Sequence, residues 1–154
     1  RSTPFVVLLV AIMPVTKFLI GTRIGATAAI VPLTVNAIPL LTRLFENSLL
    51  DTGNGILEAA LAMGATPLQL VTKFILPESL GSVILSLTTG IVGLIGASAM
   101  AGYVGGGGIG ALVLNYGYNR FNFTLMYSLV VVLIIITQCI QSLGNFFAGK
   151  ARRK

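Results

Sequence analysis

Very few residues of this chain could take part in acid–base, nucleophilic or metal chemistry. Its 154 residues include no histidine, one cysteine and four acidic residues. A histidine base and a histidine-ligated metal are therefore excluded, and Cys139 alone can form neither an intrachain disulfide nor a cysteine-based zinc site. No serine or cysteine has a plausible base. We expect no catalytic residues, no metal and no cofactor, and the chain is not predicted to be an enzyme.

A glycine-rich segment, residues 102–110, is the one place where a nucleotide site could be suspected. It contains a G-x-G-x-x-G match at Gly105, Gly107 and Gly110. Such a match arises easily in a glycine-rich run, no strand-then-helix pattern surrounds it, and no Gly-Lys-Ser/Thr follows. We predict a flexible or tightly packed loop here, so any ATP chemistry must come from another protein.

The composition places the chain in a membrane. Hydrophobic residues make up 55% of it and Asp, Glu, Lys and Arg only 9%, whereas a soluble domain carries about 25% charged residues. The mean hydropathy is +0.96. These values exclude a conventional soluble enzyme and a disordered tail, and they predict an integral membrane protein.

The membrane spans are predicted in four charge-free runs, which extend over residues 2–16, 24–42, 79–119 and 121–149. A spanning helix needs about 20 mostly apolar residues. The first run is short, but it reaches residue 20 if Lys17 extends its charged end toward water. We predict an all-α, polytopic helical bundle with about four spans. Because the first residue is Arg rather than Met, we expect a fragment that has lost one or more upstream spans.

The basic C-terminal segment sets the predicted orientation. Residues 150–154 contain four Lys and Arg residues, and loops rich in these residues stay in the cytoplasm. With four spans, residues 51–78 then lie in the cytoplasm as well.

Residues 51–78 are predicted to form two short helices that meet at a glycine. Asn54-Gly55 predicts a turn, and residues 56–63 are good helix formers. Gly64 follows where the left-handed residue after a helix end is expected.

The second short helix begins with a capping box. Thr66 is the expected N-cap, Pro67 occupies the first helical position and Gln69 the third. We expect Pro77 to end this helix, because a proline biases the preceding residue away from the helical conformation.

Taken alone, the segment has two simpler interpretations. It could be an interfacial amphipathic connection between spans. It could also be a helix-turn-helix DNA reader, but its second helix would offer only Gln69, Thr72 and Lys73 to bases or phosphates. That is too little for groove readout, and we expect no nucleic acid partner.

The spacing of Glu58-Ala59-Ala60, Gly64 and Leu76-Pro77 resembles the EAA loop of ABC-importer permeases. Phe74 stands where that family usually has Ile, and it keeps an apolar side chain there. Over most of its length the chain is similar to the permease subunits of bacterial methionine importers. The further segments that carry this resemblance are residues 1–5, 28–35, 46–47, 62–67, 98–100 and 116–118.

The resemblance implies a type I ABC-importer transmembrane domain, with residues 1–154 as one permease domain and a fifth span missing upstream. It implies that the cytoplasmic loop, residues 51–78, docks on a separate ATPase subunit. The loop residues that it singles out for coupling are Glu58, Ala59, Ala60, Gly64, Thr66, Pro67 and Pro77. In addition, Leu68, Val71 and Phe74 could anchor the second helix against the chain's own spans.

The resemblance also implies partners and a location. A homodimer of the permease would lie in the bacterial inner membrane with two ABC ATPase subunits, and an external substrate-binding protein would deliver the cargo. The cargo would be methionine, as the D or L form, or a similar amino acid.

Polar residues within the apolar runs are candidates for a translocation path, because polar groups at membrane depth are costly unless they are paired or face a cavity. These candidates are Asn36, Ser98, Asn115, Tyr116 and Tyr118. Asn36 and Ser98 could equally satisfy neighbouring backbone. Near Ser98, the small residues Gly93, Ala97 and Ala101 favour close helix packing.

A second class of function stays open from the sequence. The chain could be a secondary amino-acid transporter or a structural membrane subunit without an ATPase partner. Secondary carriers tend to contain internal repeats, and we find no convincing repeat here. A loop with a capping box also has no evident purpose without a docking partner.

Overall fold

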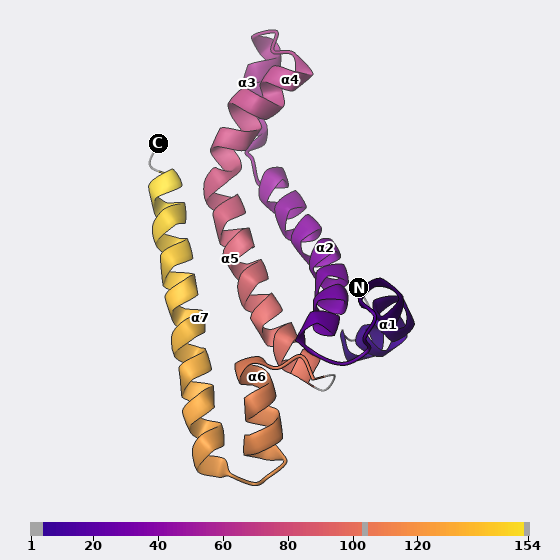
Figure 1. The fold of residues 1–154 in the computed structure, drawn as a ribbon. Helices are drawn as coiled ribbons and strands as arrows, with labels where there is room; N and C mark the ends of the chain where they lie inside the picture. The colour runs from indigo at the N-terminus through magenta and orange to yellow at the C-terminus, as the bar shows by residue number, and fades with distance from the viewer. Residues whose placement is uncertain (1–4, 103–104, 153–154) are drawn as a thin grey trace. The chain divides into compact units, whose positions relative to one another are not determined.

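The structure is a computed structural model that describes residues 5–102 and 105–152. All regular elements in these residues are helical, which confirms the predicted all-α class (Figure 1). In chain order they are α1 (Phe5–Ile20), α2 (Ala26–Leu50), α3 (Asn54–Ala62), α4 (Pro67–Gln69), the π-helix η1 (Leu70–Ile75), α5 (Leu76–Ala101), α6 (Gly108–Leu112), the π-helix η3 (Val113–Tyr118) and α7 (Phe123–Ala151).

Within the described residues, three helical stretches are long and apolar enough to cross a membrane. They are α2 with 25 residues, the continuous stretch Pro67–Ala101 with 35 and α7 with 29. The fourth expected span corresponds to α1, which is apolar but has only 16 residues. At 1.5 Å per residue α1 is about 24 Å long, less than the roughly 30 Å of hydrocarbon.

Pro77 does not end a helix, contrary to the sequence-based expectation. The chain stays helical from Pro67 to Ala101, and Leu76 keeps the right-handed helical conformation with φ −60° and ψ −50°. The change that accommodates the proline lies just before it, where residues Leu70–Ile75 form a π-helix. A proline has no N–H to donate and its ring clashes with the carbonyl four residues earlier. The wider π-helical turn can relieve both constraints without breaking the helix.

The chain divides into two compact units. The first comprises Arg1–Leu40 and Ile91–Cys139, and the second comprises Leu41–Gly90 and Ile140–Lys154. The helices α2, α5 and α7 each contribute one part to each unit.

Small residues make the closest contacts in the first unit. Leu9, Ala29 and Ala101 are buried together. A Cβ atom added to Gly102 would lie 2.6 Å from the Cβ of Ala111, and Gly110 is packed against Ala99. Gly102 and Gly110 are therefore closely packed, in line with one of the two sequence-based interpretations, whereas a Cβ added to Gly107 or Gly108 would meet no atom within 4 Å.

In the second unit, the contacts between helices are made by serine and threonine hydroxyls and by a glycine. Ser48 on α2 and Ser86 on α5 are linked by a hydrogen bond of 2.5 Å between their Oγ atoms, and Ser86 also donates to the carbonyl of Leu44. Gly144 on α7 lies against Thr88 on α5, where an added Cβ would overlap the threonine side chain. Small and hydroxyl-bearing residues are the usual means of close helix packing in membranes.

Candidate functional site

The candidate site is the loop at residues 51–78, in which α3 lies beside η1, the continuation of α4 (Figure 1). The turn between α3 and α4 is a Schellman motif. Gly64 has φ +76°, as predicted, and its N–H donates to the carbonyl of Leu61 at 2.9 Å. The N–H of Ala65 donates to the carbonyl of Ala60 at 3.1 Å. These two bonds satisfy carbonyls that the helix end would otherwise leave without partners.

The start of α4 is the predicted capping box. The N–H of Gln69 donates to Oγ1 of Thr66 at 3.4 Å, and the N–H of Thr66 donates to Oε1 of Gln69 at 3.0 Å. Pro67 occupies the first turn, where its missing N–H has no consequence. The loop therefore consists of two helices whose facing ends are fixed by backbone and side-chain hydrogen bonds.

The first helix of the loop begins earlier than the sequence predicts. It starts at Asn54, so Asn54 and Gly55 belong to its first turn, and Gly53 is the N-cap with no side-chain cap bond. A turn signal directly before a run of good helix formers is easily absorbed into the first helical turn, where backbone N–H groups need no intrahelical partner.

The surface of the loop combines apolar side chains with one carboxylate. Ala60 is fully buried, whereas Glu58 and Ala59 are exposed. Met63 and Leu68 are 71% and 74% exposed. The expectation that Leu68 and Val71 anchor the second helix on the chain's own spans is therefore wrong, since Val71 is exposed too and only Phe74 is half-buried. Exposed apolar residues on a hydrogen-bonded hairpin form a surface suited to contact with another protein.

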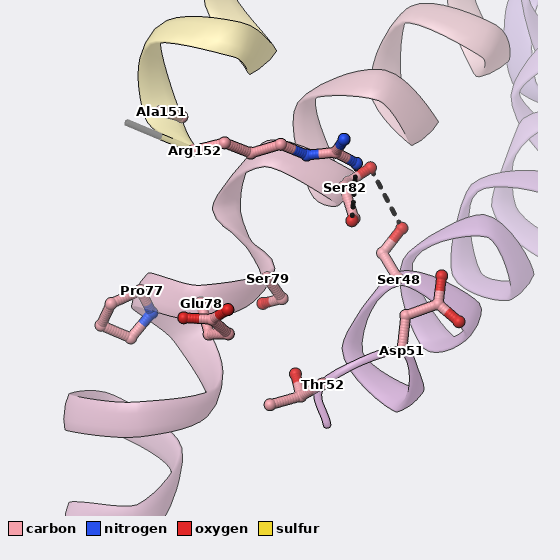
Figure 2. Close-up of a pocket in the computed structure, with 9 residues that line it drawn as sticks. All are labelled: Ser48, Asp51, Thr52, Pro77, Glu78, Ser79, Ser82, Ala151 and Arg152. Atoms are coloured by element: carbon pink, nitrogen blue, oxygen red, sulfur yellow. Dashed lines mark hydrogen bonds between the residues drawn. The ribbon is translucent and has the colours of Figure 1, made fainter. Parts of the chain in front are cut away.

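At the base of this loop, the second unit contains a polar pocket of about 320 Å³, which we call the inner pocket (Figure 2). It is lined by Ser48, Asp51, Thr52, Pro77, Glu78, Ser79, Ser82, Ala151 and Arg152. The ends of α2 and α7 and the start of α5 contribute to it. Sequence reasoning missed the pocket, because Ser82 and Arg152 come together from positions 70 residues apart.

Among the expected translocation-path residues, Ser98 lies in an apolar groove of the first unit with a volume of about 410 Å³. The groove is lined by Ile30, Leu33, Thr34, Ala37, Ile91, Leu94, Ile95 and Ser98. The Ser98 hydroxyl donates to the carbonyl of Ile95 at 2.7 Å, and the Thr34 hydroxyl donates to that of Ile30 at 2.8 Å. Both hydroxyls are satisfied by their own helices, which favours a structural role for Ser98.

The other path candidates do not line this groove. Asn36 is half-buried on α2. Asn115, Tyr116 and Tyr118 are exposed and lie together on η3. Arg120 stacks over the Tyr116 ring, with its guanidinium carbon 4.7 Å from the ring centre. Three of the five candidates therefore lie on η3, whereas Ser98 lies on α5 and Asn36 on α2.

Comparison with known proteins gives consistent matches over nearly the whole chain. Residues 1–153 match the family model described as "Binding-protein-dependent transport system inner membrane component". The "Probable D-methionine transport system permease protein MetI" of Vibrio cholerae is 54% identical over 145 residues, which are 94% of this chain and 64% of that protein. The Pasteurella multocida protein of the same name is 47% identical over 150 residues, 97% of this chain and 69% of that protein.

A solved structure agrees with these relatives. A chain in "Inward facing conformations of the MetNI methionine ABC transporter" is 45% identical and superposes with a TM-score of 0.89. The match covers 98% of this chain and 70% of that one. The present chain therefore spans between 64% and 70% of the length of these proteins.

Proposed function

This chain belongs to the family of binding-protein-dependent transport system inner membrane components, and from that premise we propose that it forms the membrane-spanning part of an ATP-driven importer. Its proposed cargo is methionine, as the D or L form, or a similar amino acid. The Vibrio cholerae and Pasteurella multocida relatives carry D-methionine transport in their names, which supports this choice.

The observation that carries the proposal is the geometry of the loop at residues 51–78. Its two helices are joined by a Schellman turn at Gly64 and a capping box at Thr66, and Met63 and Leu68 are exposed beside them. A hairpin stabilised in this way and apolar at its surface has the properties of a docking element. We propose that the groups which contact or shape this interface are Glu58, Ala59, Ala60, Gly64, Thr66, Pro67 and Pro77.

The proposed partner for the loop is a separate ATPase subunit. The glycine-rich segment of this chain lacks the Gly-Lys-Ser/Thr of a P-loop, so we place ATP binding and hydrolysis on that partner. The exposed carboxylate of Glu58 would pair with a basic residue of the ATPase.

The connection between the loop and the membrane supports a mechanical role. The second loop helix continues without interruption into α5, so residues 67–101 form one helical stretch. At 1.5 Å per residue this stretch is about 50 Å long, more than the hydrocarbon thickness. We propose that displacement of the loop by the ATPase moves α5 directly and thereby opens or closes the path between two permease copies.

Two further partners complete the proposed importer. The family description names a binding protein, and we propose that it delivers the amino acid at the outer face of the inner membrane. A second copy of the permease would form a homodimer with this one. Asn36, Ser98, Asn115, Tyr116 and Tyr118 stay candidates for the translocation path.

The test is reconstitution of the full-length permease with a candidate ABC ATPase subunit from the same organism in proteoliposomes. We expect the two proteins to co-purify and to take up labelled methionine only when ATP and the binding protein are supplied. Uptake driven by an ion gradient without an ATPase would instead support a secondary transporter. If another amino acid is taken up but methionine is not, only the proposed cargo is overturned.

A further inference from the structure

The inner pocket brings charges of both signs to one small polar space. Asp51 at the end of α2, Glu78 near the start of α5 and Arg152 at the end of α7 all line it. Among the described residues, the one ion pair joins Arg43 and Glu46. The two carboxylates and the guanidinium of the pocket therefore do not neutralise one another directly.

Thr52 places a buried hydroxyl without a hydrogen-bond partner in this pocket. This residue is only 5% exposed, and its Oγ1 atom has no hydrogen-bond partner among the described residues. Figure 2 shows that oxygen directed toward the space between Glu78, Ser79 and Asp51. A buried hydroxyl without a partner is unfavourable, and such groups in native proteins call for an explanation.

The other buried hydroxyls of the pocket are already satisfied. Ser48 donates to the carbonyl of Leu44 at 2.9 Å, and Ser79 donates to that of Leu76 at 3.3 Å. Thr52 is thus the buried hydroxyl of the pocket that has hydrogen-bonding capacity left for a ligand.

Arg152 is held in place by its stem rather than by a carboxylate. A Cβ atom added to Gly81 would lie 2.5 Å from Cγ of Arg152, so the arginine stem packs closely over this glycine. Its Nη2 atom donates to Oγ of Ser82 at 3.5 Å. A guanidinium has five N–H donors in a fixed planar arrangement, which leaves several of them for an oxyanion.

We propose that the inner pocket binds a small zwitterion that carries both an ammonium group and an oxyanion. The ammonium would lie between Asp51 and Glu78, and the oxyanion would accept hydrogen bonds from Arg152 and from Thr52. A bare metal cation fits less well, because Arg152 repels it and the described residues contain no cluster of three metal-ligating side chains. A bare anion fits less well because of the two carboxylates.

Two molecules found near a bacterial inner membrane have this chemistry. One is a free amino acid released into the cytoplasm, a source that rests on the proposed import function. The other is the headgroup of phosphatidylethanolamine, whose ammonium is joined to its phosphate by a two-carbon linker. The pocket volume of about 320 Å³ accommodates either group.

The experiment uses the full-length permease in nanodiscs without its ATPase. In one arm the lipid is phosphatidylcholine, whose quaternary ammonium has no N–H to donate, and binding of labelled methionine is measured by equilibrium dialysis. In the other arm, retention of phosphatidylethanolamine is measured by native mass spectrometry. We expect one of the two ligands to bind the wild-type protein.

Each variant removes one charge or one hydroxyl while keeping the approximate shape of the side chain. Arg152→Met keeps a stem over Gly81, Asp51→Asn is isosteric, and Thr52→Val removes only the hydroxyl. Loss of one contact to a charged group should weaken binding about tenfold for Arg152→Met and for Asp51→Asn. Lys150→Met removes a cation outside the inner pocket and serves as the matched control, with binding expected to be unchanged.

Three results would contradict the proposal that the inner pocket binds a zwitterion. The first is that neither ligand binds, and the second is that the wild type and Arg152→Met bind the ligand with equal affinity. The third is that only Ca²⁺ or only inorganic phosphate binds. ATP-driven uptake by the complete complex is measured in parallel. Its absence would count against the proposed import function, whereas the nanodisc measurement addresses the pocket alone, because binding there requires neither ATP nor a partner.

Discussion

At the scale of single residues, Gly64 is the position in the loop at residues 51–78 where the backbone conformation itself disfavours a side chain. Its φ of +76° lies in the left-handed region, and an added Cβ would meet no atom within 4 Å. The restriction is therefore conformational rather than steric, and it amounts to about 1–2 kcal/mol for a residue with a Cβ.

We predict that Gly64→Val loosens the turn between the two loop helices. Opening of the loop should become roughly 5- to 30-fold more frequent, in line with that conformational energy. The measurement is the rate of limited proteolysis within residues 51–78 of the purified full-length permease. Gly55→Ala is the control, since Gly55 lies in α3 without a positive φ and has free space around it. An unchanged cleavage rate for Gly64→Val would refute the role of this turn.

For Thr52 we predict a substitution that does not destabilise the protein. Thr52→Val removes a buried hydroxyl that has no partner among the described residues, so the free energy of unfolding should stay the same or rise by up to about 1–3 kcal/mol. Ser48→Ala should lower it, because the Ser48 hydroxyl contacts the carbonyls of Leu44 and Ser82 and the hydroxyl of Ser86. Thermal unfolding of the ligand-free protein in detergent distinguishes the two, and a clear loss of stability in Thr52→Val would contradict this account.

At the scale of elements, local sequence predicts the loop helices well because their ends are specified by neighbouring residues. Thr66, Pro67 and Gln69 contain the whole capping box, and Gly64 alone marks the Schellman turn. Pro77 shows where such reasoning fails. Its local preference is to end a helix, but a π-helix placed before it allows the helix to continue.

Features that join distant parts of the chain could not be predicted from the sequence. The inner pocket depends on Arg152 reaching Ser82, and no local pattern links these positions. The exposure of Leu68 also depends on how α4 is placed, since helical spacing shows which residues share a face but not what that face meets.

Packing between α5 and α7 in the second unit depends on Gly144. Gly144→Leu should lower the free energy of unfolding by about 1–3 kcal/mol, because any side chain at this position overlaps Thr88. Gly149→Leu is the matched control, since a Cβ at Gly149 meets no atom within 4 Å. The two variants are compared by thermal unfolding in the same detergent. Equal melting temperatures would show that this contact does not hold the helices together.

At the scale of the whole molecule, the few charges determine the expected orientation in the membrane. Four Lys and Arg residues lie in residues 150–154, and this cluster predicts a cytoplasmic C-terminus and a cytoplasmic loop. The orientation matters for the proposed function, since the proposed ATPase partner would act on the cytoplasmic side.

Cysteine labelling tests this orientation in the full-length protein. In a Cys139→Ser background, Met63→Cys should react with a membrane-impermeant maleimide only after spheroplasts are permeabilised, because Met63 is 71% exposed on the loop. Asn119→Cys, at an exposed position between η3 and α7, should react in intact spheroplasts. The reverse pattern would place the loop outside and would exclude docking to a cytoplasmic ATPase.

The π-helix η1 has a consequence for how the long helical stretch bends. Bends in helices concentrate at prolines and at π-helical turns, and here Pro77 directly follows such a turn. Residues 70–77 would therefore be the point at which the helical stretch Pro67–Ala101 bends most easily. Bending at this point would let the loop keep its contact with the proposed ATPase subunit while the displacement of the loop still changes the tilt of the remaining α5.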